Sequence, residues 1–278
     1  MTILVFTLLV FAGSTAAGLL GALTGLGGGV VLVPLLTLAF HVDLRYAIGA
    51  SLISVIATSS GAAAAYVREG YSNVRIGMFL EVATTIGALV GAYLAAKVPT
   101  RGLAILFGAV LIYSAWLSWQ GDPEDTAPRP SPWSDNLRLS GSYPSHSGEE
   151  IPYKVDRIPA GFVTMFGAGT LSGLLGIGSG AVKVLAMDRI MRIPFKVSTT
   201  TSNFMIGVTA AASAGIYLRR GYIDPSLAAP VMLGVLAGSL VGARLLSRAR
   251  VPVLRTLFGL VILALGVEMI FGGWTGKL

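Results

Sequence analysis

Two apolar stretches of this sequence are each interrupted by a glycine cluster, Gly25-Leu26-Gly27-Gly28-Gly29 and Gly176-Ile177-Gly178-Ser179-Gly180. Glycine in a helix interior costs about 1 kcal/mol relative to alanine, so clusters this dense predict that the helix unwinds. Unwound backbone at membrane depth is tolerated only where it is buried in protein or lines a wet cavity. If the apolar stretches cross a membrane, we therefore expect an interrupted helix in each half of the chain.

The composition of the chain indicates that it does cross a membrane. Hydrophobic residues make up 54% and charged residues 12% of its 278 residues, and the mean hydropathy is +0.77. A soluble domain has about 25% charged residues, so this chain cannot cover a water-facing surface. Its 20 lysines and arginines stand singly at the ends of apolar runs, not in the stripe that nucleic acid would require. We predict a multi-pass protein of the cytoplasmic (inner) membrane, surrounded by the lipid bilayer, with no nucleic-acid partner.

The scarcity of reactive side chains excludes several kinds of chemistry. The chain has no cysteine and two histidines, His41 and His146. Disulfide scaffolds, cysteine-ligated metals and thiol nucleophiles are therefore excluded, and histidine-based metal or triad chemistry nearly so. We expect no metal, no cofactor and no enzymatic activity, with a membrane enzyme or a receptor-coupled subunit as the rival class. No Lys or Arg precedes the first apolar run, which we interpret as a retained helix and not as a signal peptide.

Ten apolar segments follow one another along the chain. They lie at about 3–23, 27–40, 46–67, 76–96, 103–119, 159–175, 179–187, 197–218, 226–247 and 254–272. Most have the roughly 17–25 residues that a membrane-spanning helix needs, but the segments after the glycine clusters are too short. The predicted fold is an all-α integral membrane protein with 8–10 membrane segments and broken or re-entrant helices at the clusters.

An internal repeat relates the two halves of the chain at an offset of 151 residues. Without a gap, 26 of the 99 pairs between Gly18–Trp116 and Gly169–Val267 are identical, and the two glycine clusters fall on each other. Two homologous halves joined by a linker are a transporter architecture. We predict a first transmembrane repeat at 1–119, a polar linker at 120–158 and a second transmembrane repeat at 159–278.

The linker, about Gln120 to Ile158, holds seven of the 13 acidic residues and is rich in proline, glycine and serine. Such a segment cannot bury enough apolar surface to fold alone, so we interpret it as a solvated tether. As an alternative, Trp133 and Tyr143 dock it onto a pore mouth as a lid. The rest of the chain has 16 basic and 6 acidic residues, a formal charge of +10.

The relative orientation of the halves depends on the number of net crossings in each. Four net crossings divide the 15 lysines and arginines of the short loops ten to five, and five crossings divide them nine to six. The first division agrees better with the positive-inside rule. It would place both termini and the linker outside the cytoplasm, while the inverted arrangement remains open. A homo-oligomer is compatible with the sequence.

The helix that restarts after each glycine cluster presents unsatisfied N–H groups and the positive end of its dipole, which favour an anion. Interrupted helices in corresponding positions of two halves point to a binding site at the membrane midplane. Close packing of small residues explains Gly87 and Gly91 well, but not five-residue clusters. The predicted substrate-binding residues are Gly25, Gly27, Gly28, Gly29, Ser51, Gly176, Gly178, Ser179, Gly180, Lys183, Thr201, Ser202 and Asn203.

Lys183 lies three positions after Gly180, at a place where the first half has Leu32. A charge near the bilayer centre is costly and marks a functional site by default. In the first turn of a helix a cation also opposes the dipole. An anion held jointly by Lys183 and the glycine clusters would resolve this conflict. In the alternatives, Lys183 snorkels to the cytoplasmic face or pairs structurally with Glu81.

Six consecutive polar residues, 198–203, open a long helix in the second half. Ser198 could be the N-cap, and hydroxyls on membrane helices often bond only their own i−4 carbonyls. Because six exceed what a cap requires, we expect Thr201, Ser202 and Asn203 to face the anion. Glu81 and Glu268 are the acids deep in apolar runs, and Glu81 is our candidate for carrying a proton during transport.

At these motifs the chain resembles the TauE/SafE family of sulfite exporters, also called toluene sulfonate uptake permeases. The resemblance rests on the first glycine cluster with Pro34, on Ala50-Ser51-Leu52, on Arg68-Glu69-Gly70-Tyr71, on Gly87-Ala88-Leu89-Val90-Gly91 and on their echoes 151 residues later. It covers nearly everything except the linker. The second copy departs from the first, with Ser179 for a glycine and Leu185 at the position of Pro34.

Members of that family are multi-helix permeases for sulfite, sulfoacetate and other organosulfonates or related anions. The resemblance therefore implies a small sulfur-containing anion as substrate, where the residues alone indicate an anion. We expect a secondary transporter that binds this anion between the two interrupted helices and works by alternating access between the two repeats. The alternatives are an anion channel of the same fold and a transporter of a different small organic anion.

Overall fold

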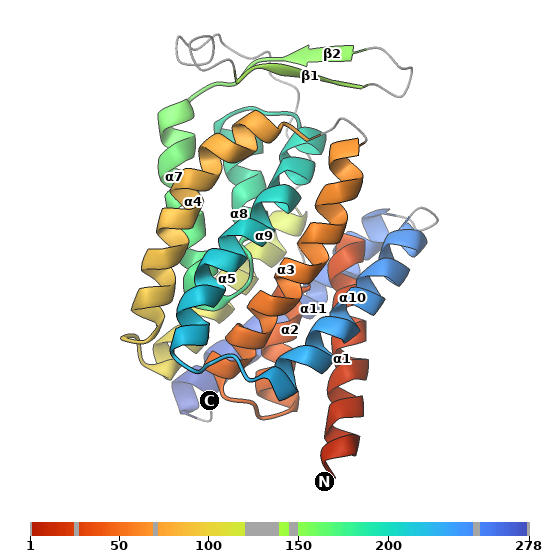
Figure 1. Ribbon diagram of the computed structural model, residues 1–278, viewed down its shortest axis with the longest axis vertical. Helices are drawn as coiled ribbons and strands as arrows, with labels where there is room; N and C mark the ends of the chain where they lie inside the picture. Colours follow the sequence, from red (N-terminus) through yellow and green to blue (C-terminus); the bar gives the residue numbers. More distant parts are fainter. Residues whose placement is uncertain are drawn as a thin grey trace.

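The computed structural model describes residues 2–24, 28–68, 72–119, 139–144, 150–246 and 251–276. They form a bundle of helices with a small β-hairpin over one end (Figure 1). The elements are α1 (Ile3–Thr24), α2 (Gly29–Pro34), the π-helical η1 (Leu35–Ala39), α3 (Leu44–Arg68), α4 (Val74–Ala95), α5 (Thr100–Trp119), β1 (Gly141–Pro144), β2 (Glu150–Tyr153), α7 (Ile158–Leu175), α8 (Gly180–Leu185), the π-helical η2 (Ala186–Ile190), α9 (Phe195–Arg219), α10 (Pro225–Leu246) and α11 (Val251–Thr275).

The described helices have the length and surface of membrane helices. Four of them contain a stretch long and apolar enough to cross a bilayer, namely Ile3–Gly21, Val74–Ala95, Ile158–Leu175 and Pro225–Gly242. Large apolar side chains such as Met78, Val163 and Leu240 are exposed on the outside of the bundle, as expected where lipid covers the surface. The prediction of an all-α integral membrane protein is confirmed.

After the first helix of each half, corresponding elements of the two halves begin 151 residues apart. The pairs of first residues are Gly29 and Gly180 for α2 and α8, Leu44 and Phe195 for α3 and α9, Val74 and Pro225 for α4 and α10, and Thr100 and Val251 for α5 and α11. This spacing equals the offset of the predicted sequence repeat. The two halves therefore follow the same order of helices.

Each half begins with a long helix and a short helical segment that returns to the same end of the molecule. In the first half, Phe6 near the start of α1 packs edge-on against Phe40, which directly follows η1, with ring centroids 6.1 Å apart. In the second half, the N–H of Asp156, just before α7, donates to the carbonyl of Met191, just after η2, at 3.0 Å. The segments α2–η1 and α8–η2 are thus re-entrant.

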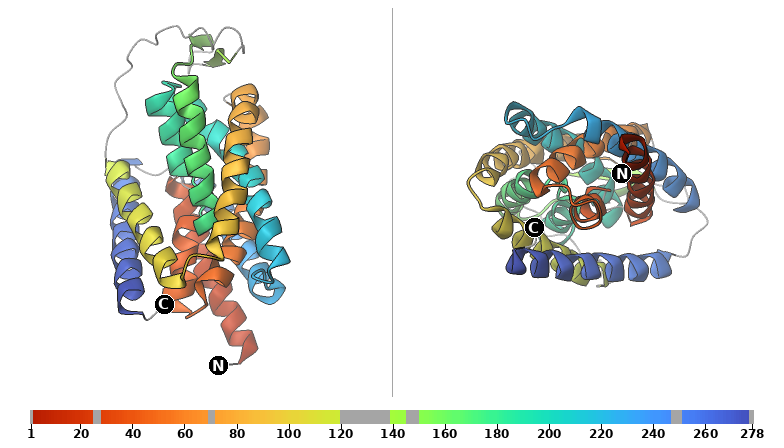
Figure 2. Two further views of the ribbon diagram at one scale, coloured as in Figure 1. Left: turned by 90° about the vertical axis from the view of Figure 1, so that its left-hand side faces the viewer. Right: turned by 90° about the horizontal axis from the view of Figure 1, so that it is seen from below.

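The next three helices of each half alternate between the two ends of the bundle. Both termini lie at one end, and the β-hairpin that precedes α7 lies at the other (Figures 1 and 2). The second half therefore starts at the end opposite to the first, and the halves are inverted. The preferred topology, with the linker at the same end as the termini, is wrong, because the re-entrant pairs contribute no net crossing and leave three crossings in each half.

The two halves are interlocked. The first helix of each half packs against the fourth helix of the other, α1 against α10 and α7 against α4, while α3 packs against α9 and α5 against α11. Figure 2 shows the α5–α11 pair along one side of the bundle. Glycines bring the backbones together: a Cβ at Gly87 would lie 2.1 Å from the Phe166 carbonyl oxygen, and one at Gly238 would lie 2.0 Å from that of Thr15. The sequence halves are therefore not separate bodies in space.

Part of the linker is folded onto the bundle, so the solvated-tether interpretation is wrong there. Strands β1 and β2 pair antiparallel, and the Tyr143 ring lies 6.2 Å from that of Tyr153. Leu139 and Tyr153 are buried in an apolar cluster with Ile76 of α4. Docking of this kind was the alternative that we considered for Tyr143, whereas Trp133 lies outside the described residues.

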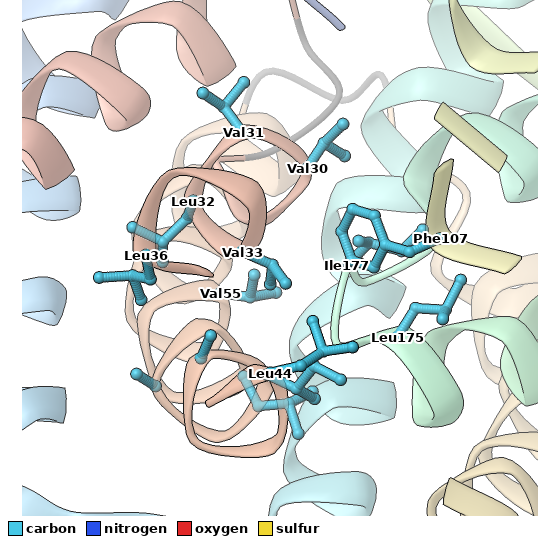
Figure 3. Close-up of a cluster of buried hydrophobic side chains, with 14 of the residues drawn as sticks. Val30, Val31, Leu32, Val33, Leu36, Leu44, Val55, Phe107, Leu175 and Ile177 are labelled. Carbon is cyan, nitrogen blue, oxygen red and sulfur yellow. The ribbon is translucent and has the colours of Figure 1, made fainter. Parts of the chain in front are cut away.

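The surroundings of α2 are apolar. Figure 3 shows its side chains Val30, Val31, Leu32 and Val33 in a buried cluster together with Val55 of α3. Leu32, at the position that corresponds to Lys183, is 0% exposed. The first re-entrant segment thus lies in an ordinary apolar core. The fold of this segment therefore does not require a charge, so the lysine on its counterpart α8 points to a function.

Candidate functional site

The two interrupted segments approach each other beside α3. A Cβ at Gly29 would lie 2.8 Å from the Ser51 hydroxyl oxygen and 3.2 Å from the Gly176 carbonyl oxygen. The Ser51 hydroxyl donates a hydrogen bond to that carbonyl at 2.9 Å. The structure thus brings together Gly29, Ser51 and Gly176, three of the predicted residues, while Gly25 and Gly27 lie outside the described residues.

The break before α8 is an unwound turn with left-handed backbone. Gly176, Gly178 and Ser179 have φ values of 67°, 68° and 47°. Residues other than glycine rarely adopt this region of backbone conformation, so Ser179 is unusual. Gly28, the corresponding residue of the first half, has an ordinary φ of −65°. The Ser179 side chain does not cap α8, and its buried hydroxyl has no hydrogen-bond partner among the described residues. This turn therefore offers a free hydroxyl group beside the break.

Ser202 on α9 also reaches the break, because its hydroxyl donates to the carbonyl of Gly180 at 3.3 Å. Thr201 is buried but bonds elsewhere, since its hydroxyl oxygen accepts from the N–H of Asn73, in the connection before α4, at 3.0 Å. Asn203 is partly buried. Of the three polar residues that we expected to face the anion, Ser202 is therefore the one that contacts the glycine segment.

Ser198 is not the N-cap of α9. The helix begins at Phe195, and the residue at the cap position is Pro194. The Ser198 hydroxyl lies in the first helical turn and donates to the carbonyl of Ile193 at 3.1 Å. The cap lies four residues earlier than predicted because Pro194, which cannot donate a backbone hydrogen bond and favours extended backbone, sets the start of the helix.

Lys183 is one end of a buried polar chain. Its side chain is 0% exposed, so the interpretation that it snorkels to the membrane surface is wrong. The ammonium group donates to the Thr209 hydroxyl oxygen at 2.5 Å, and the Thr209 hydroxyl donates to Glu81 Oε1 at 2.7 Å. We call these three residues, from α8, α9 and α4, the buried triad. The pairing with Glu81 that we considered is realised through Thr209.

Glu81 is 6% exposed and is only partly satisfied. Its Oε1 atom also accepts from the Thr85 hydroxyl at 3.1 Å. Its Oε2 atom is buried and has no hydrogen-bond partner among the described residues. An unsatisfied buried carboxylate oxygen is costly, so each such atom in a native structure requires an explanation. A proton or a ligand would supply the missing partner.

The buried triad breaks the symmetry between the halves. The residues 151 positions away from Lys183, Thr209 and Glu81 are Leu32, Thr58 and Met232. Leu32 lies in the apolar cluster of Figure 3. Thr58 donates within its own helix, to the carbonyl of Ser54 at 3.0 Å. Of the two related places in the fold, the one at α8 is therefore the charged one.

Sequence reasoning missed Thr209 and Thr85. Thr209 is identical to Thr58 in the repeat, and this identity inside an apolar helix could have drawn attention to it. No pattern in the sequence reveals Thr85, one helical turn after Glu81. Within the described ranges, no group of three or more His, Cys, Asp or Glu side chains could hold a metal ion.

A shallow cavity lies at the end of the bundle that carries the termini, and no residue of the buried triad lines it. Its volume is about 260 Å³, and its lining includes Thr7, Tyr46, Asp224 and Ser226. The side chain of Asp224 is engaged by Ser226, whose hydroxyl donates to it at 2.6 Å. Among the predicted substrate-binding residues that the structure describes, none lines this cavity.

An apolar helical bundle with inverted halves, re-entrant segments and a buried chain of polar and charged side chains is the architecture of a membrane transport protein. The comparison with protein families makes this assignment specific. The chain belongs to the TauE/SafE family, because the family model described as "Sulfite exporter TauE/SafE" matches residues 10–269. The resemblance noted in the sequence is confirmed.

Curated relatives from several organisms match the chain over nearly their whole length and have similar names. The probable membrane transporter protein YunE of Bacillus subtilis is 27% identical over 278 residues, which cover 96% of this chain and 98% of the relative. A probable membrane transporter protein of Xylella fastidiosa is 25% identical, with 99% and 98% covered. Another, MJ0441 of Methanocaldococcus jannaschii, is 23% identical, with 96% of each chain covered. No solved structure matches the chain.

These findings establish the general class of the protein. It is a multi-pass membrane transporter, as the family and the names of the relatives state. Transporter names are consistent with the expectation that the chain is not an enzyme.

Proposed function

We propose that the chain is a secondary transporter of small sulfur-containing anions, such as sulfite, sulfoacetate or other organosulfonates, and that Lys183 binds the anion. The observation that carries this proposal is a fully buried lysine beside the unwound break before α8. A cation at this depth is costly unless an opposite charge accompanies it. In the structure this role falls to Glu81, through Thr209.

Several groups around Lys183 suit an oxyanion. Ser179 lies one helical turn before Lys183, and its hydroxyl is buried without a partner among the described residues. The N–H group of Gly176 donates to the carbonyl of Ser172 at the end of α7, but the turn from Ile177 to Ser179 that follows is unwound, so its N–H groups are not part of a continuous helix. Charge-assisted bonds from an ammonium group, a hydroxyl and backbone N–H groups are the usual means of holding small oxyanions. The substrate class itself rests on the family.

The moving parts in this proposal differ from the sequence halves. One unit consists of α1, α2, η1, α3 and α10, and the other consists of α7, α8, η2, α9 and α4, since these elements pack within each group. The two units meet at α3 and α9. If one sequence half rocked against the other, the closely packed pairs α1–α10 and α4–α7 would have to separate. We therefore propose that the two interlocked units move past each other at α3 and α9.

The distribution of basic residues supports a particular orientation. With inverted halves, nine of the 15 short-loop lysines and arginines belong to connections at the linker end, and six belong to the opposite end. Cytoplasmic loops carry the excess of basic residues. We therefore propose that the linker end faces the cytoplasm and that both termini lie on the other side of the membrane.

Counterflow in proteoliposomes tests the proposal. Proteoliposomes that contain the purified protein are loaded with unlabelled sulfite or sulfoacetate, and the uptake of the labelled anion from outside is measured. We expect trans-stimulated uptake in the wild type and its loss in Lys183→Ala, whereas Lys97→Ala, at an exposed lysine, behaves like the wild type. A thermal-shift screen with sulfite, sulfate, thiosulfate, sulfoacetate and taurine ranks the anions.

Three results would overturn parts of the proposal. Unchanged counterflow and unchanged anion-dependent stabilisation in Lys183→Ala would remove Lys183 from the site. Anion flux without trans-stimulation would identify an anion channel of the same fold, because a channel has no bound intermediate to exchange. Binding of another organic anion in preference to all five sulfur compounds would correct the substrate class.

A further inference from the structure

We propose that the buried triad couples transport to protons: when an anion binds to Lys183, Glu81 takes up one proton, and the two cross the membrane together. This inference rests on the proposed anion site at Lys183. It starts from Glu81 Oε2, a buried carboxylate oxygen that has no hydrogen-bond partner among the described residues. It also uses the hydroxyl of Thr209, which joins Glu81 to Lys183.

The charges that face Glu81 are few. Helix α4 packs mainly against α7 and α9, and α7 has no titratable residue in its sequence. The hairpin places Tyr153 against the first turn of α4, where it bonds the cap residue Asn73. On α9 the titratable residues lie near the ends of the helix, at Lys196, Tyr217 and Arg219. On α4 itself they are Arg75 and Tyr93, at six and twelve positions from Glu81. Lys183 of α8 is therefore the charge to which Glu81 responds.

The net charge of the buried site explains why Glu81 should take up a proton when an anion enters. Without substrate, the ammonium group of Lys183 and the carboxylate of Glu81 balance each other. A singly charged anion at Lys183 leaves the site with one uncompensated negative charge. In a buried site that water does not screen, such a charge is strongly unfavourable. Protonation of the Glu81 carboxylate by a proton from the same side of the membrane restores neutrality.

The geometry around Thr209 accommodates both protonation states. Its single hydroxyl proton has two acceptors within reach, Glu81 Oε1 at 2.7 Å and the carbonyl of Met205 at 3.0 Å. With Glu81 ionised, Thr209 donates to the carboxylate and accepts from Lys183. With Glu81 protonated, the carboxylic O–H donates to the Thr209 oxygen, the Thr209 proton turns to Met205, and Lys183 donates to the anion.

Lys183 and Thr209 therefore have a hydrogen-bond partner in each state, and the step balances; protonation also removes the charge from the carboxylate whose Oε2 atom has no partner among the described residues. One proton is bound by the Glu81 carboxylate, and no covalent bond between heavy atoms forms or breaks. The N–H group of Lys183 exchanges the Thr209 oxygen for the anion. When the anion leaves on the other side, Lys183 returns to Thr209, and Glu81 releases its proton on that side.

Binding measurements at different pH test the linkage. The probes are sulfite and methanesulfonate; the latter keeps one negative charge throughout, so that its binding reports protonation of the protein. Thermal stabilisation in detergent gives the apparent dissociation constant. For one linked proton we expect the wild type to weaken by up to about tenfold per pH unit as the pH rises. Glu81→Gln should bind independently of pH and more tightly than the wild type at high pH.

A matched control is available at Glu268, the other acid within an apolar run, whose side chain is exposed on α11. Glu268→Gln should keep the pH dependence of the wild type. A merely structural role of Glu81 would lower the melting temperature of Glu81→Gln without removing this dependence. The slope of affinity against pH thus separates coupling from packing.

Flux measurements provide the second test. Proteoliposomes contain a pH-sensitive dye, and potassium with valinomycin clamps the membrane potential so that no proton moves merely to balance charge. We expect methanesulfonate entry through the wild type to acidify the lumen, because this anion carries no proton of its own. Glu81→Gln should still exchange labelled for unlabelled anion, because exchange requires no net proton movement, but it should not acidify the lumen.

The outcomes distinguish this inference from the proposed function. Anion binding and counterflow that are independent of pH and carry no proton would overturn the coupling and leave the transporter intact. Failure of the wild type to bind or move either probe would overturn both. If Glu81→Gln does not fold, the wild-type slope and the wild-type acidification decide the question by themselves.

Discussion

Replacing Thr209 by valine removes one hydroxyl group and leaves the shape of the side chain almost unchanged. The hydroxyl oxygen accepts from the Lys183 ammonium group at 2.5 Å and its proton goes to Glu81 Oε1 at 2.7 Å. Lys183 and Thr209 are 0% exposed and Glu81 is 6% exposed, so bulk water cannot replace the lost partner. Two buried charged groups lose a hydrogen bond at the same time.

The magnitude follows from these two bonds. A hydrogen bond to a charged group contributes about 1.5–3 kcal/mol, so the two together contribute roughly 3–6 kcal/mol. We expect a loss near the lower limit, because Glu81 Oε1 keeps its bond from Thr85 and the lysine can shift toward the carboxylate. At about 2–4 °C per kcal/mol for a chain of this size, the melting temperature should fall by roughly 6–12 °C.

Thermal unfolding in detergent, followed by tryptophan fluorescence, measures this loss. Thr209→Ser keeps the hydroxyl and should recover most of the stability. Thr58→Val is the matched control in the first half, because the Thr58 hydroxyl donates only to Ser54 and Val55 in its own helix, and it should cost little. Equal melting temperatures of Thr209→Val and Thr58→Val would show that the hydroxyl does not hold the two charges together.

Four further predictions concern packing and the hairpin. Gly87→Ala should destabilise by about 1–3 kcal/mol in thermal unfolding, since its methyl group would lie 2.1 Å from the Phe166 carbonyl oxygen. Gly215→Ala, with nothing within 4 Å, should instead stabilise by roughly 1 kcal/mol. Tyr153→Phe removes the hydroxyl that accepts from Asn73 at 2.7 Å and should speed limited proteolysis of the hairpin; unchanged cleavage would contradict this docking. Burial raises the pKa of the Tyr153 phenol, so its contribution to docking is complete below the unfolded-state pKa of about 10 and is lost as the pH rises through the higher folded-state pKa. The same proteolysis assay at alkaline pH should detect that loss in the wild type and not in Tyr153→Phe.

The features that local chemistry determines could be predicted from the sequence. Dense glycine forces a break in a helix wherever it occurs, and the left-handed turn from Gly176 to Ser179 is a direct consequence. A lysine three residues after such a break, in an apolar run, is expected either to be buried beside the break or to snorkel to the membrane surface. Lys183 is buried. The offset of 151 residues likewise gave the order of helices in the second half, because sequence repeats preserve element boundaries.

Features that depend on contacts between distant helices could not be predicted. The predicted topology, with the linker and the termini at one end, was wrong because a re-entrant pair and a crossing helix have similar hydropathy. The basic residues of the loops did not decide the question, because they divide ten to five in one arrangement and nine to six in the other. Thr201 looked like a substrate ligand because its sequence shows a polar run, whereas its partner, the N–H of Asn73, is 128 residues away. The folding of Leu139 and Tyr153 onto α4 required the bundle to be present.

The exchange of helices between the halves creates the charged site. Glu81 belongs to the first half by sequence, yet α4 packs against α7 and α9 of the second half, where Thr209 and Lys183 lie. If α4 packed within its own half, Glu81 would face the apolar surroundings of Leu32 (Figure 3), and Lys183 would lose its counter-charge. Because inverted halves place two related sites in one bundle, charge in both would double the cost of burial. The chain concentrates its charge in one of them, so a single anion and a single proton suffice for each cycle in the mechanism proposed above.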